Sequence, residues 1–321
     1  MKIAEFLPPE TSTLWSLVRQ CGVSQVVGAF NRQDSNSWHL AGIKAIRDAY
    51  RAGGFDLAVV ESRPPMEKIK LGLPGRDEEI DEVCLLIEAM GELGIPCWCY
   101  EWMPILNWIR TTTDIESRGG ALVTGFDATE AAKLPTIDAG GITEDELWNN
   151  LKYFLERVLP VAESADVRLA MHPDDPPISV VRGIPRIMRS IEAFDRLIDI
   201  VRSPMNGIAL CQGNFALMSD DLPAIIRRWG SERIFFVHMR DVIGTSEHFE
   251  ETFHDAGQTD MPACIRAYCD IGYDGVCRPD HVPTMAGDGN DRPGYSDIGR
   301  LFAIGYLRGI IHSIYGKDES P

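Results

Sequence analysis

Four residues that can bind a metal stand at or near the ends of the last four β-rich segments of the chain. They are two histidines, a cysteine and an aspartate: His172, Cys211, His238 and Asp280. Taken singly, a strand-end histidine often bonds a carbonyl group, and a cysteine is often simply buried. Four such residues in consecutive segments indicate a metal site, because the carboxyl ends of neighbouring barrel strands meet on one face.

The four side chains combine soft and hard donors, which favours Mn²⁺, Fe²⁺ or Zn²⁺ over Mg²⁺ or Ca²⁺. Cys97 and Cys99 form a C-x-C pair without a partner pair at zinc-site spacing, so we interpret both as core residues. His39, His248 and His312 have no comparable neighbours in the pattern and are interpreted as surface or packing residues.

Eight short β-rich segments, each followed by an amphipathic stretch, must position these side chains. They occupy residues 2–6, 25–30, 56–62, 96–102, 168–173, 207–213, 234–240 and 275–281. Such alternation is typical of parallel βα units, and the count favours a closed (β/α)₈ TIM barrel over an open doubly wound sheet. No glycine-rich phosphate loop follows the first segments, which further disfavours a nucleotide-binding open sheet.

The stretches between the β segments show helical periodicity. Thr143 and Glu146 form a capping-box pattern that predicts the start of a helix. Two further apolar faces are predicted to cover the barrel: Ile80, Val83, Cys84, Ile87 and Met90, and then Ile187, Met188, Ile191, Phe194, Leu197 and Ile198.

The whole chain, residues 1–321, is predicted to form one domain, since barrels of about 250 residues or more are routinely single domains. One long loop, at about 103–142, follows the fourth strand and contains Trp108, Arg110 and Arg118. Loops of this length are usually functional or mobile. A substrate wall or lid and a contact between subunits are both compatible with it, so a homo-oligomer is left open.

The composition and net charge of the chain limit which kinds of molecule it is expected to bind. Hydrophobic residues make up 45% of the chain and the formal net charge is −17, which fits a soluble globular protein and disfavours nucleic acid and anionic membranes as partners. The first residues, MKIAEFLPPE, lack a signal-peptide pattern, so a cytoplasmic location with cysteines as free thiols is expected. An acidic protein binds an acidic substrate only through a local cation, such as a metal or a few arginines.

The segments that carry these residues resemble the mannonate dehydratase family, sugar-acid lyases of the xylose-isomerase-like barrel group. The matching stretches include RLAMHPDDPP, NGIALCQGNF, RIFFVHMRDV, VCRPDHVPTM and RPGYSDIGRL, and upstream VVESRPPMEKIKLG and CYEWMPILNWIRT. They follow the family's order and spacing over nearly the whole chain.

The resemblance implies conversion of D-mannonate to 2-keto-3-deoxy-D-gluconate with one divalent metal, Mn²⁺ or Fe²⁺. It implies that His172, Cys211, His238 and Asp280 are the metal ligands. It also matches His281 and Tyr295 to the residues that move protons. We expect Tyr295 as base and His281 as acid, with the reverse assignment left open.

Further residues are expected to contact the substrate. A guanidinium fork matches a carboxylate, which makes the arginines near the strand ends candidates. The resemblance also implies a histidine in the loop after the seventh strand that either supports a metal ligand or faces the substrate. The expected substrate-binding residues are Arg110, Arg240, Arg278, His254, Asn31 and Trp108.

Two departures from the family pattern lie on the substrate side. Asn31 stands where the family generally has histidine, followed by an unmatched RQDSNSW segment, and Asn107 stands where aspartate is common. The preferred aldonate is therefore open. A sugar or sugar-acid isomerase or epimerase on the same barrel, and a non-catalytic metal-containing sugar-acid binding protein, are the alternatives.

Overall fold

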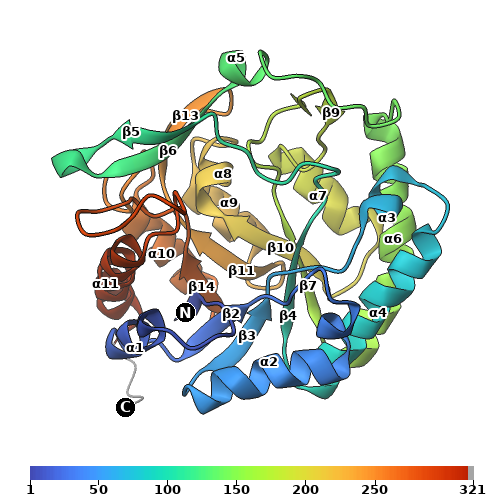
Figure 1. Ribbon diagram of the computed structural model, residues 1–321, viewed down its shortest axis with the longest axis horizontal. Helices are drawn as coiled ribbons and strands as arrows, with labels where there is room; N and C mark the ends of the chain where they lie inside the picture. The colour runs from blue at the N-terminus through green and yellow to red at the C-terminus, as the bar shows by residue number, and fades with distance from the viewer. Residues whose placement is uncertain (317–321) are drawn as a thin grey trace.

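Eight parallel strands close into a barrel in the computed structural model, which describes residues 1–316 (Figure 1). In chain order they are β1 (Lys2–Phe6), β2 (Gln25–Gly28), β3 (Asp56–Val60), β4 (Cys97–Glu101), β7 (Arg168–His172), β10 (Asn206–Cys211), β11 (Ile234–Met239) and β14 (Val276–Pro279). The last strand pairs in parallel with the first, which completes the barrel. Each strand overlaps one segment expected from the sequence, so the predicted TIM barrel is confirmed.

Helices surround the barrel (Figure 1). The longer ones are α1 (Thr13–Gln20), α2 (Leu40–Ala52), α4 (Arg76–Glu92), α6 (Glu144–Ala165), α7 (Ile191–Ile200), α9 (Leu222–Trp229), α10 (Met261–Asp270) and α11 (Asp297–Tyr315). Short helical segments are η1 (Ser35–Trp38), α3 (Glu67–Leu71), η2 (Arg118–Gly120), α5 (Ala128–Ala131) and α8 (Gln212–Ala216). Within residues 1–316, none of the helices has the length and apolar character that crossing a bilayer requires.

Helix starts follow local capping. Thr143 and Glu146 form both bonds of a capping box, and α6 begins at Glu144 as expected. The start of α7 differs from the expectation, because the Ser190 hydroxyl accepts a hydrogen bond from the Ala193 amide and begins the helix there. The apolar residues just before Ser190 are buried, but they lie outside the helix.

The connection after β4 is more ordered than the sequence suggested. It contains β5 (Thr112–Glu116) and β6 (Leu122–Asp127), which pair as an antiparallel hairpin. The loop after β11 adds β12 (Val242–Thr245) and β13 (His248–Glu251), giving a four-stranded sheet in the order β12-β13-β6-β5. The hairpin extends beyond the barrel in Figure 1. The pairing of β13 with β6 is non-local, so periodicity within either loop could not reveal it.

The interior of the barrel is filled by small and aromatic side chains. Ala4, Ala170 and Ala209 alternate with larger residues such as Phe236, and Cys97 and Cys99 belong to the same buried cluster. Both cysteines are buried as predicted, but Cys99 also lines the cavity at the barrel mouth. In barrels of this kind the active site is built at the carboxyl-terminal ends of the strands, above such a packed interior.

The short strands β8 (Val180–Val181) and β9 (Ile184–Pro185) form a small separate hairpin between β7 and α7.

Candidate active site

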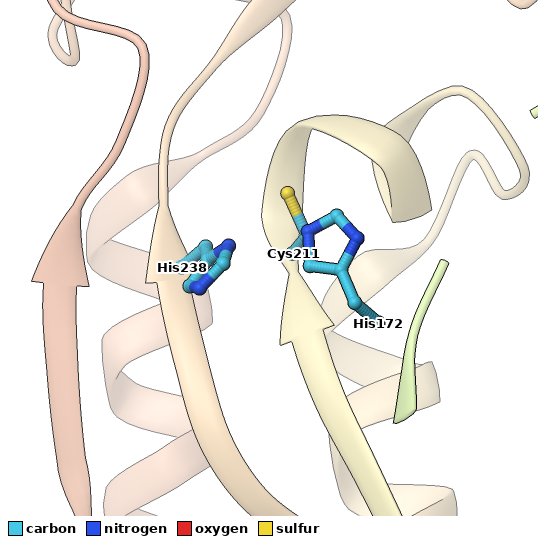
Figure 2. A group of neighbouring side chains, drawn as sticks. All are labelled: His172, Cys211 and His238. Carbon is cyan, nitrogen blue, oxygen red and sulfur yellow. The ribbon is translucent and has the colours of Figure 1, made fainter. Parts of the chain in front are cut away.

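Three of the four expected metal ligands converge at the barrel mouth. His172 ends β7, Cys211 ends β10 and His238 lies next to it on β11, where Cys211 and His238 are register partners. One ligand atom from each residue lies within 4.8 Å of the others. Figure 2 shows the three side chains close together, with Cys211 and His238 near the ends of two neighbouring strands. Parallel strands in register thus bring together residues that are 66 positions apart in the chain.

Local contacts prepare His172 and Cys211 as ligands. His172 Nδ1 lies 2.7 Å from the Pro173 carbonyl oxygen, so Nδ1 carries the proton and Nε2 keeps its lone pair for a ligand. Burial alone would raise the pKa of Cys211, but the Arg240 guanidinium and contacts with His172 and His238 lower it to about 6. Cys211 is therefore a thiolate near neutral pH, the form that binds metals.

The surroundings of His238 fit a cation. Both of its ring nitrogens are buried, and neither has a hydrogen-bond partner of good geometry in the described part of the chain. The Asp280 carboxylate lies 3.5 Å from Nδ1, and the Glu61 carboxylate lies 3.3 Å from Nε2. Burial and Arg278 lower the pKa of His238, but Glu61, Asp280 and Cys211 outweigh them and raise it well above its usual value. A site that holds a proton this firmly suits a divalent metal in its place.

Asp280 joins the group through His238. It follows β14 directly, and Arg278 donates a hydrogen bond of 2.8 Å to its Oδ1 atom. Burial alone would raise its pKa, yet Arg278, His281 and His238 hold that pKa well below the usual range. The carboxylate is therefore ionised, and of the three other expected ligands it contacts His238.

Glu61 is a residue that the sequence reasoning missed. It follows β3 directly and forms a second potential ligand group with Cys99 and His238. Arg278 holds its carboxylate through two hydrogen bonds of 2.9 and 2.8 Å. The same strand-end position that indicated the other candidate ligands could have found it.

The two expected proton-transfer residues contact each other. The Tyr295 hydroxyl lies 3.2 Å from His281 Nε2, and the edge of the Trp108 ring packs against His281 with centroids 5.0 Å apart. Burial, reinforced by the Asp280 charge, raises the pKa of Tyr295 far above its usual value, so its phenol is neutral. His281 has a φ of 45°, a left-handed conformation that costs a non-glycine residue about 1–3 kcal/mol and is typical of functional sites.

A buried ion cluster supports His281 from behind. Its Nδ1 lies 3.1 Å from both Glu251 Oε1 and Arg110 Nη2. Arg110 also forms a two-bond pair with Asp175, at 2.7 and 3.0 Å, and a 2.5 Å contact with Glu251. Arg240 reaches the same Asp175 carboxylate at 2.8 Å. Two guanidinium groups and two carboxylates, each at most 2% exposed, thus balance one another beside His281 and Tyr295.

This cluster changes the expected roles of Arg110 and Arg240. Both are engaged by carboxylates and neither lines the cavity, so the structure does not bring them to the substrate. Their position beside Glu251 and His281 instead makes them positioning residues. Asp175 does line the cavity and was not identified from the sequence, although it stands in the HPDDPP stretch.

We call His172, Cys211, His238 and Asp280 the metal group, as the residues expected to hold the metal. A cavity of about 190 Å³ connects this group to His281 and Tyr295. Trp108 and Arg278 line it as expected, and Arg278 is tied to Glu61 and Asp280. Its other lining residues include Arg32, Ser62, Arg63, Glu101, Met103 and Asn107.

Two expected substrate residues lie elsewhere. Asn31 is exposed, and its side chain accepts a hydrogen bond from the Gln33 amide, while its neighbour Arg32 lines the cavity. His254 is fully buried and bonds the Met239 carbonyl at 2.7 Å, and burial lowers its pKa to about 4. His254 is therefore neutral, bonds the end of β11 and does not line the cavity.

The chain matches the family model described as D-mannonate dehydratase (UxuA) over residues 3–139 and 136–320. It is 34% identical to a mannonate dehydratase of Enterococcus faecalis, over 93% of each chain. It is 36% identical to a mannonate dehydratase of Thermotoga neapolitana, over 97% of this chain and 96% of that one.

Solved structures agree with the fold. The crystal structure of mannonate dehydratase from Streptococcus suis serotype 2 superimposes with a TM-score of 0.91 at 31% identity, covering 98% of this chain and 94% of that one. A D-psicose 3-epimerase from Clostridium cellulolyticum reaches a TM-score of 0.63 at 14% identity, which shows a shared barrel fold alone.

Proposed function

The chain belongs to the mannonate dehydratase family, and from this premise we propose that it converts D-mannonate to 2-keto-3-deoxy-D-gluconate and water with one divalent metal, Mn²⁺ or Fe²⁺. It is a hydro-lyase that acts on a sugar acid. The observation that carries the finer proposal is the meeting of a metal-binding group and the His281–Tyr295 pair at one cavity.

The residues proposed to hold the metal are His172, Cys211, His238 and Asp280. Removing the C2 proton of an aldonate places negative charge next to a carboxylate that is already negative. A bound divalent cation supplies the positive charge that offsets this developing charge. The mixture of two imidazoles, a thiolate and a carboxylate supports Mn²⁺ or Fe²⁺ over Mg²⁺.

The proposed proton transfers follow from the contacts of His281. Nδ1 lies 3.1 Å from both the Glu251 carboxylate and Arg110 Nη2, and a guanidinium can only donate. For the reacting tautomer we propose that Nδ1 donates to Glu251 and that the Nε2 lone pair, which faces the Tyr295 hydroxyl at 3.2 Å, is the basic site. Nε2 therefore acts as the base that takes the C2 proton. Tyr295, whose pKa is raised and whose phenol is neutral, donates its proton to the departing C3 hydroxyl. This assignment is the reverse of the one first expected from the sequence.

The test is product formation by chelator-treated protein. Purified protein is freed of metal, resupplied with Mn²⁺, Fe²⁺ or Mg²⁺, and incubated with D-mannonate, and 2-keto-3-deoxy acid is measured. We expect product with Mn²⁺ or Fe²⁺ and little without added metal. No product from D-mannonate or from a panel of other aldonates would refute the proposal.

Solvent exchange separates dehydration from epimerisation. In D₂O, a dehydratase forms a 2-keto-3-deoxy product. Deuterium that appears at C2 of recovered aldonate, with no keto acid formed, would instead identify an epimerase.

A further inference from the structure

Two arginines line the side of the cavity that faces the metal group across the barrel. Arg32 follows β2 and Arg63 follows β3. In the closed strand order, β2 stands opposite β10 and β3 stands opposite β11, the strands that carry Cys211 and His238. An extended substrate bound at the metal group would therefore direct its other end toward these arginines.

Arg63 is buried and only partly satisfied. It is 7% exposed, its Nε donates to Glu101, and its Nη2 lies 3.3 Å from Glu67. Its Nη1 is also buried, yet it has no hydrogen-bond partner within residues 1–316. Leaving a buried guanidinium N–H group without an acceptor costs free energy. A ligand that supplies an acceptor for Nη1 would therefore be stabilised here.

The negative charge of Glu101 is already offset by Arg63 and Lys70, so it does not also neutralise Arg32. Lys70, which is fully buried, bonds both of its carboxylate oxygens at 2.9 and 3.1 Å. Lys70, Arg63 and Arg32 thus face only the carboxylates of Glu101 and Glu67. One positive charge is left over at this end of the cavity, in a protein whose formal net charge is −17.

Of the three arginines that line the cavity, Arg63 and Arg278 are both bonded by carboxylates, and Arg32 is the third. It is exposed, and no carboxylate of the described residues lies within ion-pair distance of it. Partial burial and the nearby positive charge of Arg63 lower its pKa, and Glu101 and Glu67 only partly offset this. Two guanidinium groups that repel each other at a cavity wall are stabilised by an anion between them.

Arg32 also lies in a segment that departs from the family pattern and has no role in the proposed dehydration. It is the first residue of the RQDSNSW segment, which departs from the family pattern. The third arginine of the cavity, Arg278, cannot serve in the same way, because Glu61 and Asp280 already bond it.

Resting on the proposed function, we propose that Arg32 and Arg63 form an anion subsite and that the preferred substrate is a sugar acid with a second anionic group at its far end. Guanidinium groups match carboxylate and phosphate equally in geometry, so an aldarate and a 6-phosphorylated aldonate both fit. D-mannonate carries a neutral hydroxyl at that end and leaves the subsite unused.

Binding calorimetry on the Mn²⁺-loaded protein tests the subsite without relying on turnover. The ligands are D-mannonate, D-mannarate and 6-phospho-D-mannonate. We expect at least one dianionic ligand to bind roughly tenfold or more tightly than D-mannonate, and the tighter of the two identifies the group. In Arg32→Gln the preference for that ligand over D-mannonate should fall to about twofold or less.

Two further variants complete the test. Arg202, 81% exposed on its side chain and located before β10 at the opposite face of the barrel, gives the control Arg202→Gln, which should keep the preference. Arg63→Lys keeps a charge beside Glu101 but removes Nη1, and should also weaken the preference if its thermal unfolding remains cooperative. Equal binding of all three ligands, or a preference that survives Arg32→Gln, overturns the subsite.

The outcomes also separate the subsite from the proposed function. Dehydration of D-mannonate without any preference for a dianion refutes the subsite and leaves the function standing. Binding of a dianion that depends on Arg32, with no dehydration of any of the three ligands, supports the subsite and refutes the function.

Discussion

Glu251→Gln is the substitution that most sharply tests how His281 is positioned. Glu251 is 2% exposed and contacts three groups: Arg110 at 2.5 Å, Arg240 at 3.4 Å and His281 Nδ1 at 3.1 Å. Glutamine has almost the same size and shape, so the substitution removes the negative charge with little change in packing.

Two separate effects are expected. The two guanidinium groups are left with the single carboxylate of Asp175, and removing one partner from a buried ion cluster costs roughly 3–5 kcal/mol of unfolding free energy. For a chain of this size that lowers the melting temperature by roughly 4–8 °C. Loss of the carboxylate that fixes the tautomer of His281 should lower kcat by about 10²–10⁴, with a small effect on KM.

The assay measures thermal unfolding and steady-state dehydration side by side, with metal content checked. Glu250→Gln is the matched control, because Glu250 is the adjacent residue on β13 and points to solvent. We expect wild-type stability and kcat for the control. A folded, metal-loaded Glu251→Gln protein with kcat within about threefold of wild type would refute the positioning role of this carboxylate.

Three further predictions concern the same site. Tyr295→Phe removes the hydroxyl 3.2 Å from His281 Nε2 and should lower kcat by about 10²–10⁴ while the metal content measured by atomic absorption stays at the wild-type value. Cys211→Ser should weaken Mn²⁺ binding, in competition with a chelator, by at least the roughly 10- to 100-fold that loss of an outer-sphere partner costs; equal affinity would exclude Cys211 as a ligand. Burial raises the pKa of Asp175 and Glu101, but Arg110 and Arg63 outweigh it and hold both pKa values well below the usual range, so their stabilisation is present above about pH 4 and is lost as the pH falls further. The melting temperature should therefore drop steeply below about pH 4, and a flat profile down to pH 3 would contradict this.

The sequence was sufficient for the barrel and for the group of residues at its mouth. Each strand is short, apolar and bounded by a helix. These three properties are local, so a short stretch of sequence is enough to reveal them. His172, Cys211 and His238 were found because residues at the carboxyl ends of parallel barrel strands lie together on one face of the barrel. Glu61 satisfied the same rule and was overlooked, because a carboxylate after a strand is common and draws less notice than a histidine or a cysteine.

The roles of the arginines could not be obtained in this way. Arg110 was expected to bind the substrate, yet its carboxylate partners are Asp175, 65 residues away, and Glu251, 141 residues away. No periodicity or spacing within a segment encodes such a pairing. Arg32 and Arg63 were missed for the related reason that the net charge at one end of the cavity is a sum over residues that follow β2, follow β3 and end β4.

Anomalous diffraction at the manganese edge tests the central claim most directly. Crystals grown with Mn²⁺ and soaked with D-mannonate should give one strong peak per chain, bonded by His172, Cys211, His238 and Asp280, with the substrate carboxylate on the metal and His281 and Tyr295 beside C2 and C3. A peak bonded by Glu61 and Cys99 in place of Cys211 and Asp280, or no peak at the barrel mouth, would contradict the account.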